Sequence, residues 1–344
     1  MQGTRLIRQS IGLLLAAGLL LCTAGCGLLK NPPKQKNARL SIVATVFPQY
    51  DFARQIAGDR ADVVMLLRPG MEAHSYEPSP KDIIRIARCD VFLHVGGESE
   101  RWLDGVLASA DNPDMAVVSA MACVEPLEEE TADGMQSPHG HDHSQEEAHE
   151  DDEDHENHED HEKHEDHEEE YDEHVWTSPM NAIAIVNEIS RVLCERDPAN
   201  ADYYCANTER YVAELLALDN SFREIAEGSK RRLLVFGDRF PLLYFVREYG
   251  LEYRAAFPGC AAETEPNAAT VAYLIDTVRA EKIPVIFYIE LSNHKVADAI
   301  AEATGTRTRL FHTCHNISAA EFAAGATYVS LMRADAEMLK EALN

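Results

Sequence analysis

The sequence is short of positive charge. Its 344 residues contain 31 Lys and Arg against 59 Asp and Glu, a formal net charge of −28. The imbalance is local, because residues 125–173 hold 24 acidic residues and the single base Lys163, a charge of −23 that leaves −5 for the rest. Since no basic face exists to neutralise phosphates, nucleic acid is excluded as a partner.

Long apolar runs and nucleotide-binding loops are also missing. Nothing resembles a Walker motif, so any energy for transport must come from partner subunits. The sustained apolar stretch over residues 11–21 is too short for an ordinary transmembrane span. With Arg5 and Arg8 before it and small residues after it, this stretch indicates an export signal over residues 1–25.

The end of this signal resembles a bacterial lipobox. Thr23-Ala24-Gly25-Cys26 would make Cys26 the lipidated first residue of the mature protein, although Thr23 stands where Leu is usual. Residues 26–38 then form a polar tether. A simple cleaved secretory signal is the alternative, and both interpretations place the folded part outside the cytoplasm.

Beyond Cys22 and Cys26, six of the eight cysteines remain. An even number in an exported protein favours disulfides. The preferred pairing joins segments expected to be neighbours: Cys89 with Cys123, Cys194 with Cys205, and Cys260 with Cys314. Buried free thiols are the alternative.

Short β-rich apolar runs alternate with helical patterns in both halves of the chain. The runs cover residues 40–47, 62–67, 91–95 and 115–119 in the first half, and 233–236, 251–257, 285–289 and 309–311 in the second. Parallel neighbours require a crossover, so this alternation predicts two α/β lobes, each with a parallel four-stranded sheet. Open α/β sheets bind ligands beyond the carboxyl ends of their strands, which places a site in the cleft between the lobes.

One long amphipathic helix is predicted between the two halves. Asp197-Pro198 favours a helix start, apolar positions recur at helical spacing to Ile225, and Gly228 ends the pattern. A helix over residues 197–228 would be about 45 Å long and would bridge the lobes at residues 39–196 and 229–344.

The first lobe contains an acidic, histidine-rich insertion over residues 128–170. It has almost nothing apolar, which predicts disorder, and its imidazoles and carboxylates suit metal collection. A solvated charge run without a role is the alternative. Nine histidines supply the accessory metal-collecting positions: His139, His141, His143, His149, His155, His158, His161, His164 and His167.

Two other histidines lie on loops with distinctive surroundings. His74 stands in a Pro-Gly…His-Ser-Tyr-Glu-Pro-Ser-Pro element, and His174 in an Asp-x-His-x-Trp-x-x-Pro element after the insertion. Together with the lipobox-like start and the long helix, these elements closely resemble the zinc/manganese ABC-transporter solute-binding lipoproteins over nearly the whole mature chain. The resemblance implies two lobes bridged by a rigid helix, with His74 and His174 as first-lobe ligands of one metal ion.

The second lobe departs from the pattern of that family. By resemblance, the third ligand falls at Asp238, the nearest candidate, or its position is occupied by Arg239. The fourth falls near His312, with His315 next. Asp238 has the alternative interpretation of a helix cap or a buried ion-pair partner.

The resemblance also implies cargo and partners. Neutral imidazoles favour Zn²⁺ over Mn²⁺, which prefers oxygen ligands. The partners would be an ABC permease and its ATPase, with the protein a monomer tethered to the membrane through Cys26. Binding, rather than catalysis, is expected.

Two other classes of function remain as alternatives. A zinc hydrolase would keep a general base beside a metal-bound water, and no His-Glu-x-x-His element or comparable pairing is present. A surface adhesin or metal buffer built around the insertion predicts that deleting residues 128–170 abolishes tight binding. The solute-binding interpretation predicts that this deletion lowers the stoichiometry and spares the tight site.

Overall fold

The computed structural model describes residues 39–135, 170–261 and 266–344. The predicted export signal, Cys26, the tether and the nine accessory histidines lie outside these residues. None of the helices in the described ranges is both long and apolar enough to cross a membrane.

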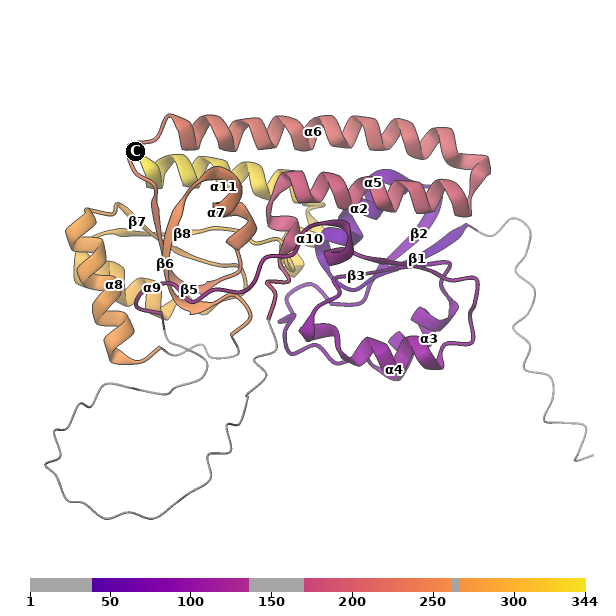
Figure 1. The fold of residues 1–344 in the computed structure, drawn as a ribbon, viewed down its shortest axis with the longest axis horizontal. Coiled ribbons are helices and arrows are strands. Elements are labelled where there is room, and N and C mark those ends of the chain that lie inside the picture. The colour runs from indigo at the N-terminus through magenta and orange to yellow at the C-terminus, as the bar shows by residue number, and fades with distance from the viewer. Residues whose placement is uncertain (1–38, 136–169, 262–265) are drawn as a thin grey trace, which may run out of the picture. The chain divides into compact units, whose positions relative to one another are not determined.

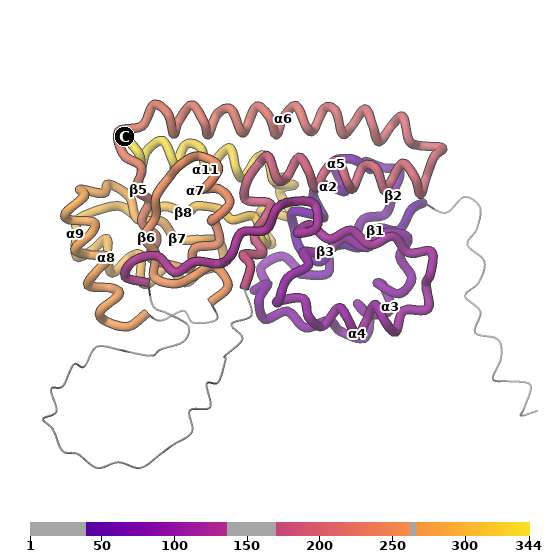
Figure 2. Tube along the Cα trace, viewed as in Figure 1, coloured from indigo at the N-terminus to yellow at the C-terminus, as the bar shows by residue number. Residues whose placement is uncertain are grey.

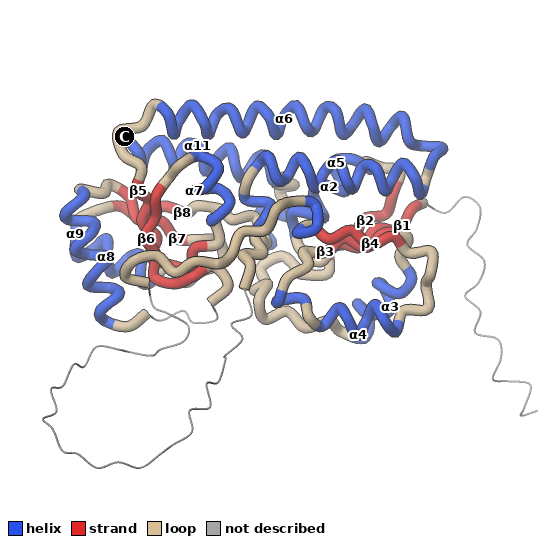
Figure 3. The backbone as a smooth tube through the Cα atoms, in the orientation of Figure 1, coloured by secondary structure: helices blue, strands red, loops and turns tan. Residues whose placement is uncertain are grey.

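The first lobe is built on a four-stranded parallel sheet in the order β2-β1-β3-β4 (Figure 1). Its strands are β1 (Leu40–Ala44), β2 (Ala61–Met65), β3 (Val91–His94) and β4 (Ala116–Ser119). Its helices are α2 (Phe47–Ala57), α3 (Pro80–Arg88), α4 (Trp102–Ser109) and α5 (Pro179–Arg196). Figure 3 shows helices on both sides of this sheet, as a parallel sheet buried on both faces requires.

The second lobe repeats this arrangement with the strand order β6-β5-β7-β8, again all parallel. Its strands are β5 (Leu233–Phe240), β6 (Glu252–Pro258), β7 (Val285–Tyr288) and β8 (Arg307–Leu310). Its helices are α7 (Leu243–Tyr249), α8 (Ala268–Glu281), α9 (Lys295–Thr304), α10 (Ala319–Ala323) and α11 (Tyr328–Leu343). The prediction of two lobes with parallel four-stranded sheets is confirmed.

The linking helix starts later than predicted. Residues Pro198–Asn200 form a 3-10 turn, and α6 runs from Ala201 to Glu227. Asp197 is not the N-cap of α6; its carboxylate instead accepts hydrogen bonds from Asn200 Nδ2 (2.7 Å) and Tyr204 Oη (2.8 Å). Helix α6 contacts α2 and α5 in the first lobe and α7 and α11 in the second, and it runs past both lobes in Figures 1 and 2.

A single hydrophobic core extends through both lobes, with smaller clusters under the outer helices of each lobe. Cross-lobe hydrogen bonds accompany it. The Trp176 indole donates to the carbonyl of Thr313 at 2.8 Å, and the Tyr328 hydroxyl donates to the carbonyl of Trp176 at 2.7 Å. Because Trp176 and Tyr328 are fully buried, these bonds fix the segments that carry the loop histidines.

The outer ends of the predicted insertion are part of the fold. Residues 128–135 reach the second lobe, where Glu130 pairs with Arg247 and Asp133 with Arg254. The Tyr244 hydroxyl joins the segments that flank the insertion on its two sides, since it accepts from the Leu127 amide and donates to the Asp172 carbonyl, both at 2.9 Å. Within 128–170, residues 136–169 lie outside the described ranges.

The structure forms no disulfide among the six described cysteines. The pairing of Cys89 with Cys123 does not fit the sheet, because Cys89 precedes β3 and Cys123 follows β4, at opposite ends of two parallel strands. Cys314 is buried in the shared core, whereas the amide of Cys260 binds Glu129 of the first lobe. For Cys194 and Cys205, the Sγ atoms lie 3.7 Å apart.

Candidate metal centre

Three imidazoles converge between the lobes. One ring nitrogen from each of His74, His174 and His315 lies within 4.8 Å of the others, the only such cluster of metal-ligating groups in the described part of the chain. The ring centroids are 5.0–5.4 Å apart. These rings line a small cavity of about 20 Å³ together with groups from both lobes, including Glu72, Arg239 and Glu290. Three nitrogen donors at this spacing suit a tetrahedral metal ion with one position left open.

His174 is held by the residue two positions before it. Asp172 Oδ1 accepts from the His174 backbone amide at 2.7 Å and lies 2.9 Å from its Nδ1. This contact places the Nδ1 proton toward Asp172 and leaves Nε2 to face the other two rings. Nε2 is fully buried and has no hydrogen-bond partner, which is costly unless something binds there. A metal ion fits this orphaned nitrogen.

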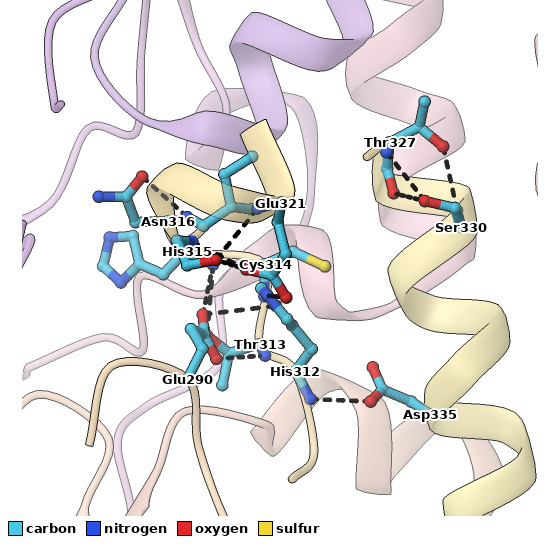
Figure 4. A network of polar contacts seen from close by, with 12 residues as sticks. Glu290, His312, Thr313, Cys314, His315, Asn316, Glu321, Thr327, Ser330 and Asp335 are labelled. Carbon is cyan, nitrogen blue, oxygen red and sulfur yellow. Dashed lines mark hydrogen bonds and ion pairs between the residues drawn. The ribbon is translucent and has the colours of Figure 1, made fainter. Parts of the chain in front are cut away.

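His315 is positioned by a carboxylate on the neighbouring strand. Glu290 follows β7 and accepts from the amides of Thr313 (2.8 Å) and His315 (3.1 Å) and from the Thr313 hydroxyl (2.5 Å), as Figure 4 shows. Asn316 then ties this loop to the loop before His74, since its amide donates to the carbonyls of Arg68 and Met71 at 2.8 Å. The ligand-bearing loops of the two lobes are therefore hydrogen-bonded to each other.

Arg239 extends from β5 into the same cavity. A one-residue irregularity interrupts the pairing of β5 with β6 between Phe236 and Arg239, which redirects the strand at this point. The Arg239 guanidinium lies 3.0 Å from the Glu72 carboxylate of the first lobe. Although Glu72 is partly buried, its pKa is lowered by this pairing. The cavity thus contains a cation and an anion beside the three imidazoles.

The three histidines differ in their affinity for protons. Burial, the neighbouring His174 and Arg239 lower the pKa of His74 to about 3. Burial and the same neighbours hold the pKa of His315 well below its ordinary value. Burial also opposes protonation of His174, but the Asp172 carboxylate outweighs it and raises the pKa. Before a metal arrives, His174 is the ring that holds a proton most firmly.

His312, ranked ahead of His315 from the sequence, lies outside the cluster. Its amide donates to Asp335 Oδ1 on α11 at 2.8 Å, and its Nδ1 accepts from the Cys314 amide at 2.9 Å. Its Nε2 lies 3.8 Å from Glu321. Burial opposes the charged form, yet Glu290 and Glu321 raise the pKa of His312 to about 9. In the structure His315, and not His312, lies beside His74 and His174.

Asp238 also lies outside the cluster. Its carboxylate accepts from the amides of Arg239 (2.9 Å) and Ile289 (3.3 Å), so it binds backbone donors, and burial raises its pKa. Arg239 takes the place beside the imidazoles, as one of the two sequence alternatives had it.

Comparison with known proteins identifies relatives along almost the whole chain. A family model described as zinc-uptake complex component A, periplasmic (ZnuA), matches residues 42–342. The high-affinity zinc uptake system protein ZnuA of Bacillus subtilis (strain 168) is 31% identical over 96% of this chain and 97% of its own length. The zinc-binding lipoprotein AdcA of Streptococcus pneumoniae is 29% identical over 97% of this chain, which spans 61% of AdcA.

Solved structures agree with this relationship. The Zn(II)-bound ZnuA-like domain of Streptococcus pneumoniae AdcA superposes with a TM-score of 0.68 at 26% identity, covering 89% of this chain and 99% of that domain. The chain belongs to the ZnuA family of zinc-uptake components.

Proposed function

We propose that this protein captures a transition-metal ion, Zn²⁺ foremost, outside the cytoplasm and delivers it to an ABC permease driven by a separate ATPase. The observation that carries this proposal is the buried, unpartnered Nε2 of His174, held toward His74 and His315 by the Asp172 contact. Relatives named for zinc uptake and zinc binding support the choice of cargo.

The three imidazoles would supply three of four zinc ligands. His74 and His174 come from the first lobe and His315 from the second, so the ion would join the two lobes. Because Glu72 and Arg239 line the same cavity as the three rings, a fourth ligand could come from water or from a carboxylate there. Nitrogen donors favour zinc over manganese, the weaker alternative.

Binding fits the site better than hydrolysis does. A zinc hydrolase needs a carboxylate or imidazole free to accept a proton from the metal-bound water. Of the carboxylates that line the cavity in the described ranges, Glu290 is bound to Thr313 and His315, and Glu72 is paired with Arg239. Neither is placed as a general base.

The remaining parts of the proposal concern residues outside the described ranges. Cys26 would carry a lipid that tethers a monomeric protein to the membrane. The nine insertion histidines would collect metal loosely and raise its concentration near the tight site.

Zinc titration of the purified protein at neutral pH, in competition with a chromophoric chelator, tests the proposal. We expect one tight site, lost in His174→Ala and His315→Ala and retained when residues 136–169 are deleted, with additional weak sites lost in the deletion. Affinity no tighter than micromolar in the intact protein would reject tight capture. Loss of the tight site in the deletion variant would favour a metal buffer built around the insertion.

A further inference from the structure

Two cysteines approach each other where the chain turns from α5 into α6. Cys194 lies in the last turn of α5, and Cys205 lies in the second turn of α6. Their Sγ atoms are 3.7 Å apart, and Cys194 Sγ is also 3.7 Å from the carbonyl of Ala201. A disulfide requires about 2.05 Å between sulfur atoms, so side-chain rotation has less than about 2 Å to cover.

The helices at this corner are already held in place by other contacts. The Thr208 hydroxyl donates to the Ser190 hydroxyl at 2.7 Å, one turn away from the cysteine pair on both helices. Asp197 accepts from Asn200 and from the buried Tyr204 within the connecting turn. The two sulfurs are therefore kept close together by contacts that lie beside them.

Access separates Cys205 from the other five described thiols, since its neighbour Cys194 is partly buried. Cys205 is exposed, whereas Cys89 and Cys314 are buried and Cys123 and Cys260 are partly buried. The Cys123 thiol faces the carbonyl of Ser119 at 3.2 Å, and the Cys89 thiol lies 3.6 Å from the sulfur of Met115. An external reagent reaches Cys205 first and then finds Cys194 next to it.

We infer that Cys194 and Cys205 form a thiol–disulfide modification site, whose oxidised form ties α5 to the start of the linking helix. The oxidant is an external disulfide. The Cys205 thiolate attacks one of its sulfurs and expels the first thiol. The Cys194 thiolate then attacks Cys205 Sγ in this mixed disulfide and expels the second thiol. Both cysteines lose a proton, and the external disulfide takes up two electrons and two protons.

The site is distant from the metal centre. Cys194 lies 15 residues beyond Pro179, the first residue of α5, which corresponds to roughly 22 Å along the helix. Oxidation therefore leaves the three imidazoles untouched, and zinc affinity should stay within about twofold between the two forms. The bridge should instead raise the stability of the fold, because it closes a short loop and restricts the unfolded chain.

Treatment of the native, reduced protein with oxidised glutathione, followed by peptide mapping by mass spectrometry, tests this inference. We expect a linked peptide containing Cys194 and Cys205, a loss of two hydrogen masses and a melting temperature raised by several degrees. Cys194→Ser should instead trap a glutathione adduct on Cys205. Cys205→Ser should form neither the linked peptide nor a glutathione adduct, and Cys123→Ser should react as the wild type does.

Two results would overturn the inference. One is a wild-type protein that keeps both thiols after prolonged exposure to excess oxidised glutathione. The other is a glutathione adduct that persists on Cys205 in the wild type, since it would show that Cys194 cannot complete the exchange. Zinc titration of each serine variant establishes that it is folded.

Discussion

Arg239 of the second lobe lies 3.0 Å from Glu72 of the first, and both residues line the cavity into which three imidazoles point. A fixed cation beside a cation site opposes metal binding, and the carboxylate offsets that opposition. Because the pair joins the lobes next to the ligands, it sets the charge that an arriving metal ion meets.

Removing the charge of Arg239 and removing the charge of Glu72 should change zinc affinity in opposite directions. Arg239→Gln takes away a repulsive charge and should tighten binding by several-fold to about tenfold, while Glu72→Gln should weaken it by a similar factor. Competition with a chromophoric chelator measures both, and raising the salt concentration should shrink the differences. Weaker binding in Arg239→Gln would mean that the guanidinium mainly positions the site.

The choice between His315 and His312 can be tested directly. His315→Ala removes one of three converging donors and should lower zinc affinity by about 100-fold or more. His312→Ala is the control, three residues away and more deeply buried, and should keep affinity within a few-fold. If His312→Ala lowered zinc affinity far more than His315→Ala did, His312 would be the second-lobe ligand instead.

Asp172→Asn tests the support behind His174. The amide keeps the size of the side chain but loses the charge that holds the Nδ1 proton, so we expect a fall in zinc affinity of about 10- to 100-fold. Ser99, whose hydroxyl donates to the neighbouring Glu173, supplies a control: Ser99→Ala should leave affinity nearly unchanged. Equal effects of the two substitutions would contradict a specific role for Asp172.

Over most of the accessible pH range, zinc binding should release one proton, and zinc affinity should depend on pH accordingly. Ligands must lose their protons to bind metal, and His174 has a raised pKa while those of His74 and His315 are lowered. Below the pKa of His174, affinity should fall about tenfold per pH unit, and the fall should steepen only far into acid. A slope of three protons near pH 6 would show that all three rings titrate together.

The contacts of His312 with its neighbouring carboxylates should make the stability of the fold depend on pH. The folded-state pKa of His312 is raised to about 9, so its contribution is complete below the ordinary histidine pKa of about 6.5 and is lost as the pH rises toward 9. The pKa of Glu321 is lowered to about 2 mainly by His312, so its contribution is lost as the pH falls from about 4.5 toward 2.

Melting temperatures of wild type and His312→Gln between pH 5 and 9 test this linkage. The difference between the two proteins should shrink toward high pH as wild type loses the contribution. A difference that stays constant across this range would mean that His312 acts through packing alone.

Much of the fold was set by local patterns. Apolar runs such as residues 285–289, bounded by Pro284 and Glu290, predicted strands because a parallel strand buried on both faces must be apolar throughout. Helix α5 begins at Pro179 with Ser178 as its N-cap, and both residue types are common at helix starts. A single C-terminal helix over roughly residues 319–342, which the sequence pattern also predicts, does not form, because Gly325 with φ 76° separates α10 from α11.

The sequence by itself determined that the chain has two α/β lobes joined by a helix and that His74 and His174 stand on loops beside them. Only the tertiary structure decided which second-lobe groups reach the cavity. Cys314 adopts a left-handed φ of 60°, and Glu290, distant in sequence, gathers the amides of Thr313 and His315; together they turn His315 inward and leave His312 against α11. Neither a left-handed non-glycine residue nor a carboxylate arriving from another strand leaves a local pattern in the sequence.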